Sequence, residues 1–260
     1  MKNRDYYKIT ICFMALSMIL VGCGNRSLSS NDDADASKTE IMKSEDSGIV
    51  DVESQVQVPQ ESEKQESEKL EQIEILNPSN DTFVRVQDYI PTIQQDLRYA
   101  TTNNFTGQVI YTFEEAYLRY GTVKKLQQVC EELEAYGIGI KIWDAFRPLQ
   151  AQAKLWEVYP DEKYVSHPNK GNRNHCRGLA VDITLYDLKT GEELEMPSGF
   201  DEFSALGDRE YSDCSAKATE NSKLLESIMT KCGFKGYSKE WWHYNDTDTY
   251  PIEEVFVPAE

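Results

Sequence analysis

Histidine is scarce in this 260-residue chain, which contains only His167, His175 and His243. Basic residues are also outnumbered, with 27 Lys and Arg against 45 Asp and Glu and a net charge of −18. This balance argues against binding to nucleic acid and against a basic patch that binds anionic wall polymers, because binding to either polyanion requires positive charge. Small or neutral substrates suit the chain better.

The N-terminus lacks an apolar run long enough to cross a bilayer comfortably. Residues 9–21 are apolar and follow a positively charged start, whereas a membrane-spanning helix needs about 20 apolar residues. Residues 1–22 are therefore interpreted as a secretory signal. The run Leu-Val-Gly-Cys (20–23) resembles the lipobox of bacterial lipoproteins, which predicts lipidation of Cys23 and anchoring to the bacterial cell membrane. A simple N-terminal anchor with an incidental cysteine is the alternative, and either arrangement is extracytoplasmic.

Residues 23–80 are poor in aromatic residues and rich in Ser, Gln and charged residues. From residue 24 to residue 80 there are 14 acidic and 5 basic residues, a net charge of −9 that is half of the total. Such a segment buries too little apolar surface to offset the entropy of ordering it. We expect an acidic disordered tether over 23–80, followed by one folded domain over 81–260 that holds the tryptophans and most of the tyrosines.

The cysteines predict neither a metal motif nor a particular disulfide. Cys12 and Cys23 belong to the N-terminal segment, and an even number outside the cytoplasm permits disulfides among the rest. The remaining cysteines, for which no pairing is predicted, are Cys130, Cys176, Cys214 and Cys232. Cys176 follows His175, and on an extended segment its side chain would point the other way. We therefore do not expect Cys176 to be a ligand.

Two helices are expected before and after a central group of strands. Thr112 and Glu115 form a capping-box pattern that predicts a helix start, with an interruption at Gly121-Thr122. Apolar residues then recur at helical spacing until Gly137. A second periodic run predicts a helix over 216–232, ended by Gly233.

Alternating residues predict the strands. Ile138, Ile140 and Ile142 alternate and lead to Arg147, which lies at a junction between this strand and a helix over 148–159. Residues 178–186 alternate so that Asp182 faces away from the aliphatic row, and the turn at 189–192 predicts a hairpin. The pattern indicates an α+β fold with an antiparallel central sheet flanked by helices.

His175, Asp182 and His243 have the chemistry of a metal site. Two imidazoles and one carboxylate are suitable zinc donors, and hydrolytic zinc sites commonly use three protein ligands. Glu240 lies three residues before His243, near enough to act as a base. The alternative is that these histidines are ordinary core or surface residues, which is the interpretation kept for His167.

The whole set of motifs resembles one family. The sequences His175-x-x-Gly-x-Ala-x-Asp182 and Glu240-x-Trp-His243, preceded by Asp-Ala-Phe-Arg-Pro (144–148), resemble the zinc-dependent D-alanyl-D-alanine dipeptidases. These are the VanX-like branch of the D,D-peptidases, peptidase family M15, which have a hedgehog/D,D-peptidase-like fold. The resemblance extends from residue 96 to residue 244 and does not include the signal or the tether.

The resemblance implies roles for individual residues. His175, Asp182 and His243 match the ligands of one Zn²⁺ per chain, Glu240 matches the catalytic base and Arg147 the group that stabilises the transition state. Asp201 and Trp242 fall in segments that border the substrate pocket. A structural salt bridge with Asp144 is the alternative role for Arg147. The family often has Ser where this chain has Arg173, so substrate contacts on that side are expected to differ.

The implied activity is hydrolysis of D-alanyl-D-alanine or a similar short D,D-peptide in cell-wall peptide metabolism. Two alternatives stay open. A D,D-carboxypeptidase that trims peptidoglycan stem peptides would share the metal ligands, and a noncatalytic lipoprotein that binds wall peptides would share the fold. Glu240 and Arg147 count against the noncatalytic alternative, because metal binding alone requires neither. The sequence predicts no oligomeric state.

Overall fold

The computed structural model describes residues 77–258, which contain nearly all of the domain expected over 81–260. The expected signal, Cys23 and most of the expected tether lie outside the described residues. No helix within 77–258 combines the length and the apolar character that crossing a membrane requires. In the same part of the chain, Cys130, Cys176, Cys214 and Cys232 are free thiols.

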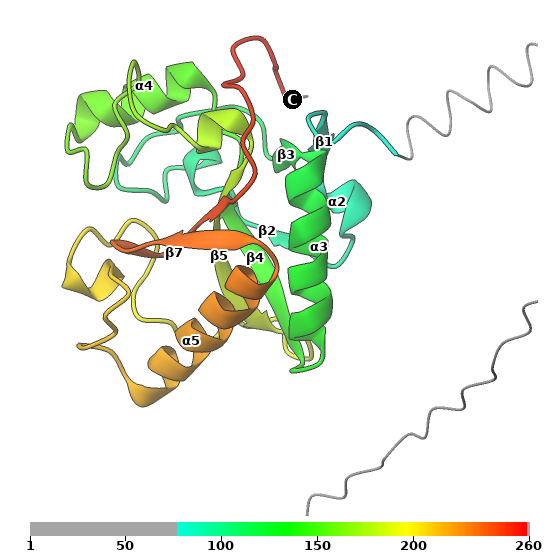
Figure 1. Ribbon diagram of the computed structural model, residues 1–260. Coiled ribbons are helices and arrows are strands. Elements are labelled where there is room, and N and C mark those ends of the chain that lie inside the picture. Colours follow the sequence, from blue (N-terminus) through cyan, green and yellow to red (C-terminus); the bar gives the residue numbers. More distant parts are fainter. Residues whose placement is uncertain (1–76, 259–260) are drawn as a thin grey trace, which may run out of the picture. The chain divides into compact units, whose positions relative to one another are not determined.

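A five-stranded sheet forms the centre of the fold (Figure 1). Its strand order is β2 (Gln94–Gln95), β4 (Ile138–Asp144), β5 (Ala180–Asp187), β7 (Glu240–Asp246) and β6 (Phe234–Tyr237). The pair β2 and β4 is parallel, and all other neighbours are antiparallel. The predicted antiparallel central sheet is therefore confirmed, with one short parallel strand added at its edge.

Helices flank this sheet, as predicted. In Figure 1, α3 (Tyr120–Glu134) runs beside β4 and α5 (Ala216–Lys231) lies below β7, while α4 (Leu149–Val158) lies at the opposite end from α5. The remaining elements are β1 (Phe83–Arg85), α2 (Val86–Tyr89), η1 (Arg98–Ala100), β3 (Tyr117–Arg119), η2 (His175–Arg177) and η3 (Ala205–Gly207). Strands β1 and β3 pair with each other in a separate two-stranded sheet.

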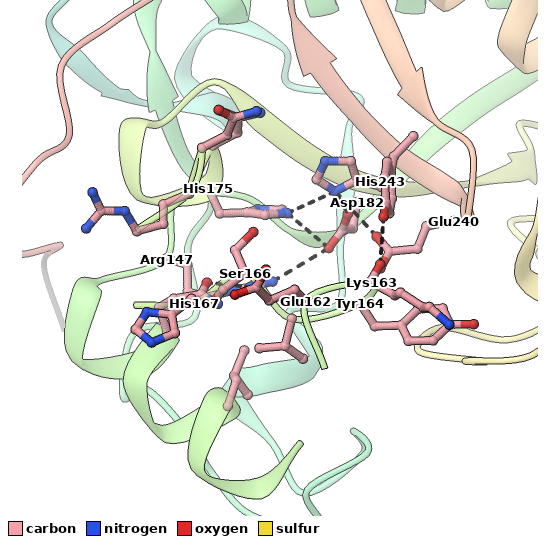
Figure 2. Close-up of a pocket in the computed structure, with 18 of the residues that line it drawn as sticks. Arg147, Glu162, Lys163, Tyr164, Ser166, His167, His175, Asp182, Glu240 and His243 are labelled. Carbon is pink, nitrogen blue, oxygen red and sulfur yellow. Dashed lines mark hydrogen bonds and ion pairs between the residues drawn. The ribbon is translucent and has the colours of Figure 1, made fainter. Parts of the chain in front are cut away.

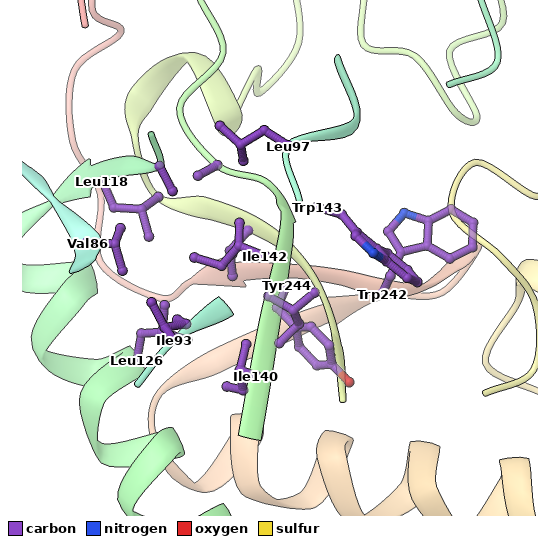
Figure 3. Close-up of a cluster of buried hydrophobic side chains, with 14 of the residues drawn as sticks. Val86, Ile93, Leu97, Leu118, Leu126, Ile140, Ile142, Trp143, Trp242 and Tyr244 are labelled. Carbon is purple, nitrogen blue, oxygen red and sulfur yellow. The ribbon is translucent and has the colours of Figure 1, made fainter. Parts of the chain in front are cut away.

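Part of the apolar core lies between α3 and the sheet (Figure 3). Ile140 and Ile142 of β4 pair with Leu185 and Ile183 of β5, so these four side chains share one face. All four are almost completely buried, as is Leu126 of α3. Burying each such side chain contributes about 1.5–3 kcal/mol relative to leaving it exposed. The alternation of these strands in the sequence therefore identified the buried face correctly.

The expected helix start at Thr112 is wrong. The helix begins at Tyr120, and the residues before it form a loop and then β3. In that loop Tyr111 and Phe113 are buried and stack on each other at 4.3 Å. Burial of these aromatic rings outweighs the local capping preference, which is worth only about 1 kcal/mol.

Gly121 does not interrupt the helix, because it lies in the first turn of α3. A Cβ atom at this position would lie 2.1 Å from the Tyr250 hydroxyl oxygen. The glycine therefore allows the C-terminal segment to approach the helix closely. The end at Gly137, with φ +72°, and the helix over 216–232 are as predicted, the latter to within one residue.

Two further local expectations need correction. The turn at 189–192 forms, but the hairpin is reduced to one isolated bridge between Tyr186 and Glu193. Cys176 lies in the short 3-10 helix η2 rather than on an extended segment.

A one-residue register shift at Trp143 aligns the end of β4 with β5. Ile142 pairs with Ile183, whereas Asp144 pairs with Asp182. By simple alternation Asp144 would share the face of Ile142, and an extra residue in one strand resets that alternation. The shift therefore brings Asp144 to the face of Asp182, which is the face opposite the aliphatic core.

We predict that Gly178→Ala destabilises the domain more than Gly107→Ala. Both glycines have positive φ, +70° and +66°, so an alanine costs about 1–2 kcal/mol at either position. At Gly178 a Cβ atom would also lie 2.4 Å from the Phe83 ring, whereas at Gly107 nothing lies within 4 Å. Urea unfolding measures both losses, and equal losses would contradict the predicted steric effect of Phe83.

Candidate metal and catalytic site

Three adjacent strands place a row of polar side chains across the sheet. Asp144 at the end of β4 is opposite Asp182 of β5, which in turn is opposite His243 of β7. Directly opposite residues of antiparallel strands have Cβ atoms about 4.5–5.5 Å apart. Residues that are far apart in the sequence therefore come within reach of a common point.

His175 reaches the same point from the 3-10 helix η2, which immediately precedes β5. Its Nδ1 lies 2.7 Å from the Ala145 carbonyl oxygen. The Arg147 amide also donates to the His175 carbonyl at 3.3 Å. The imidazole is therefore held against the loop that follows β4, with Nε2 directed toward the row of Asp182 and His243.

The predicted ligand atoms converge (Figure 2). One donor atom from each of His175, Asp182 and His243 lies within 4.8 Å of the others. His175 Nε2 is 3.2 Å from His243 Nδ1 and 3.4 Å from an Asp182 oxygen, and His243 Nδ1 is 2.9 Å from the other oxygen. Within the described residues 77–258, this is the only group of three or more His, Cys, Asp or Glu side chains that converge in this way.

The hydrogen bonds around both rings fit a metal ion. The second nitrogen of each ring faces an acceptor, since His175 Nδ1 faces the Ala145 carbonyl and His243 Nε2 is 3.0 Å from the Asn245 side-chain oxygen. With both ring protons on those nitrogens, two lone pairs and a carboxylate face one another. A cation can bind such a set of lone pairs, and two imidazole nitrogens with one carboxylate oxygen are typical zinc ligands.

Electrostatics keep these donors in the form that binds a metal. Burial alone would raise the pKa of Asp182, but the neighbouring His175 and His243 outweigh burial and hold its pKa below the ordinary value. Burial lowers the pKa of His243. Asp182 is therefore held as the carboxylate and His243 as the neutral imidazole, as metal coordination requires.

Glu240, the first residue of β7, lies beside the three donors. One of its carboxylate oxygens is 3.8 Å from His243 Nδ1, and the residue is buried. Burial raises the pKa of Glu240 well above the ordinary value, and the charges of Asp182 and Asp201 raise it further. A carboxylate with a raised pKa is a better proton acceptor, which is the property that a general base needs.

Arg147 faces the cavity from the loop between β4 and α4. Its Nη2 lies 3.9 Å from an Asp182 oxygen (Figure 2), and the same guanidinium donates to Asp144 at 2.5 and 3.0 Å. The alternative role, a salt bridge with Asp144, is thus present and coexists with a position in the cavity. Burial alone would lower the pKa of Arg147, but Asp144, Tyr99 and Asp182 together outweigh burial and raise the pKa, so the charge is retained.

Asp201 and Trp242 also line the cavity. The Tyr99 hydroxyl lies 3.0 and 3.2 Å from the two Asp201 oxygens. Burial, followed by the charge of Asp182, raises the pKa of Asp201 well above the ordinary value. Asp201 has φ +58°, a conformation that is uncommon for a non-glycine residue and that often marks a functional position.

The cavity has a volume of about 350 Å³ and a mostly polar surface. Residues 162–167 and 170–174, which include His167 and Arg173, line part of it. His167 packs on the Trp156 ring at 4.8 Å and is outside the group of converging donor atoms. Cys176 is buried and is likewise outside that group.

Sequence reasoning missed two residues that hold these side chains in place. Gln152 accepts from Arg147 Nη1 at 2.9 Å, and its spacing of five residues carried no signal. Arg209 donates to the backbone carbonyls of Tyr237, Trp241 and His243, and so ties the β6–β7 hairpin together from an irregular segment. The Asp144–Arg147 pair, in contrast, was already the alternative that the sequence offered for Arg147.

An α+β domain that gathers two imidazoles, a carboxylate, a buried glutamate and an arginine around one small cavity has the composition of a metal-dependent hydrolase. Comparison with known proteins agrees. The family model described as D-ala-D-ala dipeptidase matches residues 79–258. The chain therefore belongs to the D-ala-D-ala dipeptidase family, Peptidase_M15, and is a peptidase.

Curated relatives carry the same description. A D-alanyl-D-alanine dipeptidase of Escherichia coli (strain K12) is 37% identical over 164 residues, which is 62% of this chain and 84% of that protein. A D-alanyl-D-alanine dipeptidase of Enterococcus faecium is 32% identical over 181 residues, 62% of this chain and 90% of that protein. The solved structure of VanYB in complex with D-Alanine-D-Alanine aligns with 51% of this chain and 73% of that chain, at 17% identity and a TM-score of 0.34.

We predict that Asp144→Ala lowers the free energy of unfolding of the metal-free protein by about 3–5 kcal/mol, because it leaves the buried Arg147 charge without its partner. Asp144 is completely buried. Asp88→Ala is the control, since it breaks an ion pair with Arg85 in which both side chains are about half exposed. Chemical denaturation measures both, and a loss for Asp144→Ala no larger than that of the control would contradict the prediction.

Proposed function

We propose that this chain is a zinc-dependent dipeptidase that hydrolyses D-alanyl-D-alanine or a similar short D,D-peptide. The observation that carries the proposal is the convergence of His175, Asp182 and His243 beside Glu240 and Arg147. The names of the curated relatives support the choice of substrate. The proposed metal stoichiometry is one ion per chain.

His175 Nε2, His243 Nδ1 and an Asp182 oxygen are the proposed ligand atoms, because the other nitrogen of each ring already faces an acceptor. A bound zinc ion supplies Lewis acidity, which polarises a carbonyl and lowers the pKa of water toward neutrality. Glu240 is not one of the three proposed ligands. Its carboxylate lies 3.8 Å from His243 Nδ1, which is near enough to act as a base on water bound at this centre.

Glu240 and Arg147 have separate roles: Glu240 transfers the proton, and Arg147 stabilises the negative charge that develops on the substrate. As water adds to the peptide carbonyl, Glu240 accepts the proton of the water and passes it to the leaving amine. Negative charge develops on the carbonyl oxygen at the same time. Arg147 donates hydrogen bonds to that oxygen, and this interaction is stronger in the transition state than in the substrate because the charge is then larger.

Asp201 is the proposed contact for the free ammonium group of the dipeptide. Its carboxylate lines the cavity and is oriented by the Tyr99 hydroxyl. An ammonium ion would restore the ionised form that burial disfavours. The cavity volume of about 350 Å³ is near the lower end of the range for small-molecule sites, about 300–1,000 Å³, which favours a dipeptide over a long stem peptide.

We predict that the purified chain, loaded with zinc, releases D-alanine faster from D-alanyl-D-alanine than from a stem pentapeptide ending in the same two residues. Glu240→Gln should lose about 10²–10⁴-fold in kcat, because it removes the base, while it retains one zinc per chain. Glu162→Gln is the matched control, since Glu162 also lines the cavity but is exposed and paired with Lys170. Amine release and metal analysis measure these outcomes.

Three results would contradict the proposal in different ways. Trimming of the pentapeptide with the dipeptide left intact would favour the D,D-carboxypeptidase alternative. Persistent activity in Glu240→Gln would remove Glu240 as the base. Tight peptide binding without turnover in the zinc-loaded wild type would favour a noncatalytic lipoprotein.

We further propose that the protein is a lipoprotein, anchored outside the cytoplasmic membrane through Cys23. The apolar run 9–21 and the sequence Leu-Val-Gly-Cys (20–23) support this proposal. An extracytoplasmic dipeptidase would meet peptides released from the cell wall. This location gives no reason to infer glycopeptide resistance, which requires removal of the cytoplasmic dipeptide.

We predict that Cys23→Ala abolishes lipid attachment to the full chain when it is expressed in a bacterium. Labelled fatty acid should enter the wild-type chain and not the variant, because the thiol is the proposed acceptor. Cys214→Ala is the control and should be labelled like the wild type. Membrane attachment of an unlabelled wild-type chain would instead support a simple N-terminal anchor.

A further inference from the structure

We propose that Asn245, oriented by Asn174, is a positioning residue that keeps His243 in the tautomer able to bind the metal. This inference rests on the proposed zinc site and deepens it. Neither asparagine belongs to the motifs that predicted the site. Both lie at the edge of the cavity that the three ligand residues line.

The strand places Asn245 beside the imidazole. His243 and Asn245 are two residues apart on β7, so their side chains project from the same face of the sheet. The Asn245 side-chain oxygen is 3.0 Å from His243 Nε2. Asn174, the residue that precedes His175, donates its side-chain amide to the same oxygen at 2.7 Å.

The ring of His243 has a choice between two neutral tautomers. With the proton on Nε2, the ring donates to Asn245 and leaves the Nδ1 lone pair for a metal. With the proton on Nδ1, the ring would donate to the Asp182 oxygen 2.9 Å away and would compete with metal binding. The Asn245 oxygen disfavours the second state, because it would then face the Nε2 lone pair, acceptor against acceptor.

Asn174 completes the arrangement. An asparagine amide can reverse its oxygen and nitrogen, and a reversed Asn245 would donate to Nε2 and favour the wrong tautomer. In its present orientation Asn174 opposes this reversal, because its amide NH₂ would then meet the NH₂ of Asn245, so the two asparagines would have to reverse together. His175 needs no such control, since its Nδ1 faces the Ala145 backbone carbonyl, which cannot reverse.

The test measures metal binding rather than turnover. Zinc dissociation constants are determined for the purified full chain by competition with a chromophoric chelator, and the visible spectrum of the cobalt-loaded protein reports the ligand geometry. Asn245→Leu removes the acceptor, and Asn245→Asp retains it. Asn221→Leu is the control, because Asn221 is a buried asparagine whose amide donates to the Glu195 carbonyl at 2.9 Å, outside the cavity.

We expect Asn245→Leu to weaken zinc binding by about 10–100-fold and to alter the cobalt spectrum. Asn174→Ala should weaken binding in the same direction but less, because Asn245 can then reverse. Asn245→Asp should bind zinc within about threefold of the wild type, because its carboxylate oxygen can still accept a hydrogen bond from His243 Nε2. Loss of such a partner usually has a larger effect, about 10–100-fold. Asn221→Leu should bind zinc like the wild type.

The failures of the two proposals are distinguishable. A wild-type chain that does not bind one zinc ion overturns the proposed zinc site itself. A wild type that binds zinc, with Asn245→Leu binding equally well, overturns only the role of Asn245. Equal weakening by Asn245→Leu and Asn221→Leu also overturns that role, because it would reflect a general loss of structure. An Asn245→Asp variant as weak as Asn245→Leu would overturn the need for an acceptor.

Discussion

The pairing of β5 with β7 is the constraint on which the site depends. In this register Asp182 is directly opposite His243, so that a carboxylate and an imidazole meet across one antiparallel pair. A slip of one residue would turn either side chain to the opposite face of the sheet. Aliphatic residues on the core face of β5, such as Ile183 and Leu185, are completely buried. Their burial therefore keeps the donor row in place.

Buried charge at the site is balanced rather than avoided. Asp144 neutralises Arg147, while Asp182 lies between both histidines and within 3.9 Å of the same guanidinium. Glu240 has no comparable cation beside it, and its pKa is raised by burial first and then by the negative charges of Asp182 and Asp201. A divalent cation would reduce this excess of negative charge, so the electrostatics of the converged donors favour cation binding. The scaffold thus concentrates acidic groups around the converging side chains of His175, Asp182 and His243.

Sequence patterns predicted this molecule well where neighbouring residues decide the structure. The alternation around Ile140 and Ile142, the helix ended by Gly233 and the α+β class are all as expected. Local patterns failed where distant contacts compete with them. The capping box at Thr112 is overridden because the adjacent Tyr111 is buried, with its hydroxyl donating to Asp144, and Gly121 is a point of close approach to Tyr250.

By itself, the sequence determined the chemistry that is available: which residues are imidazoles and carboxylates, which faces are apolar and which family pattern they match. Only the tertiary structure decided which of these groups meet. The register shift at Trp143 carries Asp144 to the face of Asp182, and the ring of His243 turns Nδ1 toward Asp182 and Nε2 toward Asn245. The physical reason is that strand register and hydrogen-bond direction depend on packing between segments far apart in the chain, which no local pattern encodes.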